Sequence, residues 1–121
     1  MSEIVHCYSR REAIADGVLV DASGAAREAG FRFPVALTAA VWSEYVTVPT
    51  DVPHQDEAGR LWDILWMLRY GISQASDESV IKFVVHVQND DGPPRPVHLK
   101  AICGPGDEGE PVITILLPNE D

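Results

Sequence analysis

The spacing of apolar residues changes abruptly near Ser79, and this change divides the chain into two kinds of structure. Before Ser79, apolar residues recur every three or four positions, which is the period of a helix with one buried face. This helical stripe consists of Leu61, Ile64, Leu65, Leu68 and Ile72. After Ser79, apolar and polar residues alternate, as they do in strands that bury one face. We therefore predict helices in the first part of the chain and a sheet in the second.

The predicted helix that carries the stripe begins after two acids, Asp56 and Glu57, which the positive end of a helix favours. Trp62, Trp66 and Met67 widen its apolar face to more than half of its circumference. So wide an apolar face is typical of a helix buried between layers. We expect both tryptophans to pack in the core, and an exposed aromatic patch that binds a partner protein is the alternative.

Three shorter helices are predicted before this one from their N-terminal caps. Ser9 and Glu12 have the spacing of a capping box. Ser23 opens the second helix, and Thr38 is of the residue type that caps the third. The three helices are expected at residues 9–17, 23–29 and 39–46, with a short strand at 18–20.

Three strands are predicted after Ser79, at residues 80–87, 97–102 and 112–117. Clusters of Gly, Pro, Asn and Asp separate them, and such clusters form turns. Short turns join antiparallel neighbours, so one apolar face of this sheet should pack on the tryptophan-bearing helix. The expected fold is a single α+β domain over residues 1–121: several helices, then a three-stranded antiparallel meander. Residues 18–20 are a candidate fourth strand at its edge.

The charge of the chain is strongly negative and unevenly placed. Nine lysines and arginines face nineteen aspartates and glutamates, a formal charge of −10 over 121 residues. Most of the excess lies after residue 50. Such a field repels nucleic acid and anionic membranes and attracts basic protein surfaces. The alternative is that the charge only keeps the protein soluble. The candidate contact residues, acting as phosphate mimics, are Asp90, Asp91, Asp107, Glu108, Glu120 and Asp121.

The sequence lacks the common catalytic motifs, and we predict neither catalytic residues nor a cofactor. It contains no G-x-S-x-G, phosphate-binding loop, H-E-x-x-H or C-x-x-C pattern. A hairpin centred near Gly92 would place His86 and His98 opposite each other. We interpret them as two solvated imidazoles. The alternative is a metal site or enzyme on this face, which would need a third ligand such as His54 or Cys103.

The two cysteines, Cys7 and Cys103, and the start of the chain indicate a reducing compartment. The first residues lack the basic and apolar regions of a secretory signal. No apolar run approaches the ~20 residues that a membrane span needs. We expect a cytoplasmic protein with reduced thiols and no membrane contact.

Several sequence blocks carry a family resemblance that covers nearly the whole chain. They lie at residues 8–21, 26–38, 59–67, 104–107 and 110–121, and include AREAGFRFPVALT and GRLWDILWM. Together they resemble a family of small, acidic, uncharacterised bacterial proteins that is common on plasmids, phages and integrative elements. The family is defined by a domain of unknown function, so the resemblance implies no catalytic residues. It implies an accessory protein of a mobile genetic element.

Charge and resemblance together predict a non-enzymatic binding protein. Its expected partner is a host or element-encoded protein with a basic groove, as for an anti-defence inhibitor of the anti-CRISPR or antirestriction type. Direct nucleic-acid binding is not expected. The alternatives are a metal-binding protein or enzyme that uses His86 and His98, and a homodimeric accessory protein that associates through an exposed tryptophan face.

Overall fold

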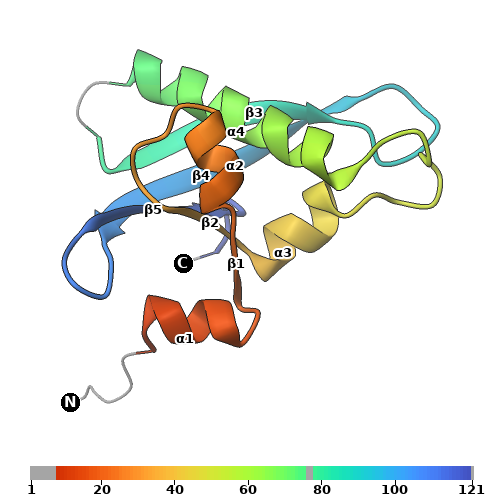
Figure 1. The fold of residues 1–121 in the computed structure, drawn as a ribbon. Helices are drawn as coiled ribbons and strands as arrows, with labels where there is room; N and C mark the ends of the chain where they lie inside the picture. The colour runs from red at the N-terminus through yellow and green to blue at the C-terminus, as the bar shows by residue number, and fades with distance from the viewer. Residues whose placement is uncertain (1–7, 76–77, 121) are drawn as a thin grey trace.

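The computed structural model describes residues 8–75 and 78–120. Within them the chain forms a five-stranded, mostly antiparallel sheet with helices on both sides (Figure 1). The elements are α1 (Arg10–Ala15), β1 (Leu19–Asp21), α2 (Ser23–Glu28), β2 (Val35–Thr38), α3 (Ala39–Val41), the π-helix η2 (Trp42–Val46), α4 (Glu57–Gln74), β3 (Val80–Val87), β4 (Arg95–Pro105) and β5 (Pro111–Leu116). The fold is therefore mixed α+β.

The strands follow the order β1-β2-β5-β4-β3 across the sheet. β3, β4 and β5 pair antiparallel in succession, and β1 pairs antiparallel with β2. β2 and β5 run parallel, with Val35 beside Ile113 and Leu37 beside Ile115. The short strand expected at 18–20 is β1, and it lies at the edge of the sheet beside β2.

β2 is an inner strand of the sheet that the sequence did not predict. Its first three residues, Val35, Ala36 and Leu37, are all buried, because the strand lies inside the sheet with its two faces covered. A strand buried on both faces shows no alternation of polar and apolar residues. The expectation of three or four strands was wrong for this reason.

α4 packs the aliphatic part of its stripe against one face of the sheet. Leu61, Ile64, Leu65 and Leu68 are buried there with Phe83, Val85, Leu99 and Ile115 in one core cluster. α1 lies on the opposite side of the sheet (Figure 1). The sheet is therefore the middle layer, and α4 is an outer layer.

The expectation that Trp62 and Trp66 belong to the core was wrong. Their relative exposures are 38% and 49%, and Tyr70, one turn further, is 59% exposed. The four buried aliphatic residues already fill the contact with the sheet, and no further layer of the described residues covers the outer face of α4. The aromatic side chains on that outer face therefore meet solvent.

The three predicted short helices are present: α2 begins at Ser23 as expected, and side chains cap the other two. Ser9 and Glu12 form both hydrogen bonds of the capping box, and the Thr38 hydroxyl accepts a hydrogen bond from the N–H of Val41. The helix expected at 39–46 exists as α3 followed by η2. Ser23 does not cap α2: its Oγ accepts from the N–H of Val35, and donates to the carboxylate of Asp21, so it joins β1 to β2 instead.

Candidate functional site: an aromatic hollow beside a carboxylate

The exposed face of α4 carries one aromatic ring per turn. Trp62, Trp66 and Tyr70 are spaced by four residues, and neighbours at that spacing lie on one helix face. The two indole rings are stacked, with centroids 6.1 Å apart and an interplanar angle of 16°. α4 is fixed at its start by Asp56, whose carboxylate accepts a hydrogen bond of 2.7 Å from the N–H of Gly59. The aromatic row is thus presented on a rigid, well-capped helix.

A hollow of about 410 Å³ lies between this row and the edge strand β3. Its walls combine the aromatic rings of α4, the thioether of Met67 and one carboxylate with residues of β3. The lining residues are Trp62, Asp63, Trp66, Met67, Val85 and His86. Electron-rich ring faces beside a carboxylate are the surroundings that stabilise a cation.

The carboxylate of Asp63 is the charged group of this hollow. Asp63 is an exposed residue, and the partial desolvation of its carboxylate by the neighbouring side chains raises its pKa. Among the described residues, none forms a hydrogen bond or an ion pair with its side chain. Partial loss of hydration without a compensating partner disfavours the charged form, and an incoming cation would restore that lost stabilisation.

Arg69 shows how such a cation would sit. Its guanidinium carbon lies 5.4 Å from the ring centroid of Trp66, over the ring face. This is the geometry of a cation–π contact. The row therefore already holds one guanidinium of the chain itself on one side, while the hollow with Asp63 lies open.

The six acids predicted as contacts do not form one surface. Asp90 and Asp91 lie in the turn between β3 and β4, whereas Asp107 and Glu108 lie in the turn between β4 and β5. β4 has 11 residues, so these turns are roughly 33 Å apart. Glu120 lies elsewhere, beside Thr38. Asp121 is outside the described residues.

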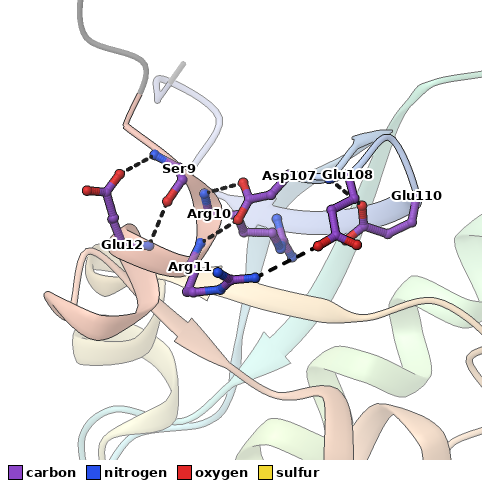
Figure 2. A network of polar contacts seen from close by, with 7 residues as sticks. All are labelled: Ser9, Arg10, Arg11, Glu12, Asp107, Glu108 and Glu110. Atoms are coloured by element: carbon purple, nitrogen blue, oxygen red, sulfur yellow. Dashed lines mark hydrogen bonds and ion pairs between the residues drawn. The ribbon is translucent and has the colours of Figure 1, made fainter.

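Two of these acids also have structural partners within the chain. The Asp107 carboxylate accepts hydrogen bonds from the backbone N–H groups of Arg11 and Arg10, which lower its pKa (Figure 2). Glu120 accepts from the Thr38 hydroxyl at 2.7 Å and from the N–H of Leu117 at 2.8 Å. Their oxygens are therefore already occupied by protein donors.

Asp90 and Glu108 make weaker contacts. Asp90 accepts from the N–H of Gly92 at 2.8 Å, and its second oxygen lies 3.3 Å from Arg95. Glu108 lies 4.0 Å from Arg11, and both of those side chains are 81% exposed. An exposed ion pair of this kind contributes little. Asp91 and Glu108 keep most of their charge available to solvent.

His86 and His98 are not directly opposite each other. His98 pairs with Val84 and His86 with Pro96, because the loop between the strands is centred on Asp91 rather than Gly92. The two imidazoles are diagonal neighbours on one exposed face. The described residues contain no group of three or more His, Cys, Asp or Glu that could hold a metal ion.

The corrected register brings together a different pair. Lys82 is directly opposite Lys100, and these are the only lysines of the chain. Like charges directly opposite each other on a sheet are unfavourable. The open face of β3 and β4 is thus locally cationic on an acidic protein.

Sequence reasoning missed Asp63 as a member of the site and Tyr70 as a member of the exposed aromatic row. The available signal was the four-residue spacing of Trp62, Trp66 and Tyr70, which places a row of aromatic residues beside the aliphatic stripe of the same helix. Two tryptophans in a wide apolar face were assigned to the core, although the aliphatic positions alone were sufficient to cover a sheet.

The model of the family of unknown function DUF6573 matches residues 1–121. No match was found among curated proteins or solved structures. Among the described residues, none of the helices has the length and apolar character that crossing a membrane requires.

Proposed function

The chain belongs to the family DUF6573, whose function is unknown, and from the site geometry we propose that it is a non-enzymatic binding protein for a basic protein partner. The observation that carries the proposal is the partly desolvated carboxylate of Asp63 beside the exposed, stacked rings of Trp62 and Trp66. The partner would insert an arginine side chain into this hollow.

An arginine fits this hollow for two physical reasons. Its planar guanidinium stacks on aromatic faces, and its N–H groups pair with a carboxylate. Trp62 and Asp63 offer these two kinds of contact from adjacent positions on α4. Tryptophan, tyrosine and arginine also dominate the energetics of protein interfaces.

The negative charge of the chain supports the same class of partner at longer range. A formal charge of −10 attracts a basic surface and accelerates its encounter with the protein. The dispersed acids suit this steering role better than a shared contact, because they lie at separate places on the molecule. The described ones are Asp90, Asp91, Asp107, Glu108 and Glu120, and Asp121 is outside the described residues.

We also propose a biological context. The sequence blocks resemble proteins of plasmids, phages and integrative elements, and an acidic binding protein of such an element could block a defence protein of its host. It would occupy the basic groove in which that protein holds nucleic acid, as anti-CRISPR and antirestriction inhibitors do. The support is the family resemblance together with the charge.

The test is a titration of the protein with a short oligo-arginine peptide, followed by the fluorescence of the tryptophans. Asp63→Asn and Trp62→Ala should each weaken binding by about tenfold, because each removes one of the two contacts to the guanidinium. Trp62→Ala is chosen because it leaves the contact between Arg69 and Trp66 in place. For this variant binding is followed by calorimetry.

Asp91→Asn is the matched control. It removes the same charge from an exposed turn that does not line the hollow, and we expect a change of less than about twofold. Equal losses for Asp63→Asn and Asp91→Asn would mean that charge alone attracts the peptide, and would contradict the site. Far-ultraviolet circular dichroism shows that each variant keeps its helices.

A further inference from the structure

A second cavity lies at the other end of α4 and does not belong to the aromatic hollow. It has a volume of about 390 Å³, within the usual range for sites of small molecules. The loop before β2, the end of α4 and the core face of β4 enclose it. Its lining includes Phe31, Phe33, Arg69, Ile72, Ile81 and Cys103.

The cavity exists because the side chains on the core face of β4 become smaller beneath the end of α4. Along β4, the core-facing side chains are Leu99, Ala101 and Cys103. Leu99 fills the space under the middle of α4, but Ala101 and Cys103 are smaller and leave volume above them. Phe33 and Ile72, each 40% exposed, form an apolar rim.

Arg69 is held at this cavity from two sides. Its guanidinium stacks over Trp66 and also lies against the backbone of Gly30. A Cβ at residue 30 would be 3.2 Å from the guanidinium carbon, and the φ of Gly30 is +97°, so glycine suits both the approach and the backbone conformation. Arg32 also lines the cavity, so within residues 8–75 and 78–120 its lining holds two arginines and one acid, Glu78.

We propose that this cavity binds a small amphipathic carboxylate, such as a medium-chain fatty acid. The alkyl chain would cover Phe31, Ile81 and Cys103, and the carboxylate would pair with Arg69. An apolar interior with cationic groups excludes an alkylammonium ligand by charge and makes an uncharged alcohol the weaker ligand. This proposal concerns a separate cavity and does not depend on the arginine-binding hollow.

Cys103 offers a direct readout of occupancy. In a Cys7→Ser background it is the only thiol of the chain, so the rate of alkylation by a maleimide reports access to the cavity wall. Decanoate, kept below its micelle concentration, should slow this alkylation, whereas decylamine should not. Lengthening the acid from octanoate to decanoate should tighten binding by about fourfold per methylene.

Arg69→Gln separates the role of charge from that of apolar packing. We expect decanoate to bind about tenfold more weakly to this variant and decanol to bind it as it binds the parent protein. A Cys103 rate unaffected by decanoate, or equal protection by decanoate and decylamine, would overturn the proposal. An equal loss of decanoate and decanol would also overturn it, because Arg69 would then act on the shape of the cavity. Binding of oligo-arginine is measured separately, so either proposal can fail alone.

Discussion

The two turns that flank β4 look alike in sequence and play opposite parts in the structure. Residues 89–92 read NDDG and residues 106–109 read GDEG. The first turn is held by a buried arginine beneath it, whereas the second turn itself holds another part of the chain. Composition alone could not distinguish them, because the difference depends on what lies next to each turn in space.

Arg60 holds the first turn. It is 6% exposed, and it donates hydrogen bonds to the backbone oxygens of Tyr45 and Gln88 and to the side chains of Gln55 and Asn89. One guanidinium thus ties η2, the loop before α4 and the end of β3 together. The cost of burying its charge is offset by four acceptors.

Asp107 makes the second turn a cap for α1. Its two oxygens accept from the backbone N–H groups of Arg10 at 2.7 Å and Arg11 at 3.0 Å, across 97 and 96 residues of sequence (Figure 2). The side chain of Arg10 continues the contact to the Thr114 hydroxyl and the Ile113 carbonyl on β5. An acid in a glycine-rich turn can therefore be a helix cap supplied from a distant part of the chain.

The largest effect on stability is expected for Arg60, the buried arginine that supports the first turn. Arg60→Met keeps the approximate length of the side chain but leaves the carbonyls of Tyr45 and Gln88 without their donor. We expect the free energy of unfolding to fall by about 2–4 kcal/mol, as when a buried hydrogen-bond network is broken. Urea unfolding of the variant and the parent protein measures this difference in free energy.

Arg27→Met provides the control for this substitution. Arg27 is exposed on α2, and the same change there should cost less than about 0.5 kcal/mol. Similar losses for the two variants would show that the Arg60 network does not stabilise the first turn.

A smaller and more local effect is expected at the second turn. Asp107→Ala removes the acceptor of two N–H groups at the start of α1, so α1 should open more often while the sheet stays folded. Hydrogen exchange at the amides of Arg10 and Arg11 should accelerate by about tenfold. Glu108→Gln, in the same turn, should leave these amides unchanged, and acceleration by both variants would argue against a cap.

The same contact predicts a dependence on pH. The N–H groups of Arg11 and Arg10 lower the pKa of Asp107 in the folded protein, so the folded state binds this proton less readily than the unfolded chain does. Its stabilisation is complete above the unfolded pKa of about 3.9 and is lost as the pH falls through the lower folded value. Asp107→Asn should lack this acid-dependent part. A carboxyl titration of Asp107 by NMR that shows an ordinary pKa would contradict the contact.

Local signals in the sequence predicted much of this fold, and contacts between distant segments account for what was missed. The Ser9–Glu12 capping box, α4 and the three last strands follow from spacing within a few residues. β2 was missed because a strand between two neighbours in a covered sheet has no alternation. The hollow beside Asp63 was missed because exposure of Trp62 depends on which layers are present, and no spacing in the sequence specifies that.

The smallest effect is expected at the surface of the first turn. Asp90 pairs with Arg95 at 3.3 Å, and the two side chains are 44% and 72% exposed. Asp90→Asn keeps an oxygen that can accept from the N–H of Gly92, so it removes little more than an exposed ion pair. Exposed ion pairs contribute less than about 1 kcal/mol and are weakened by salt, so the unfolding midpoint should move only slightly at low salt and not at high salt. A loss as large as that of Arg60→Met would show that the turn is held from its surface, and the contrast between the two turns would then fail.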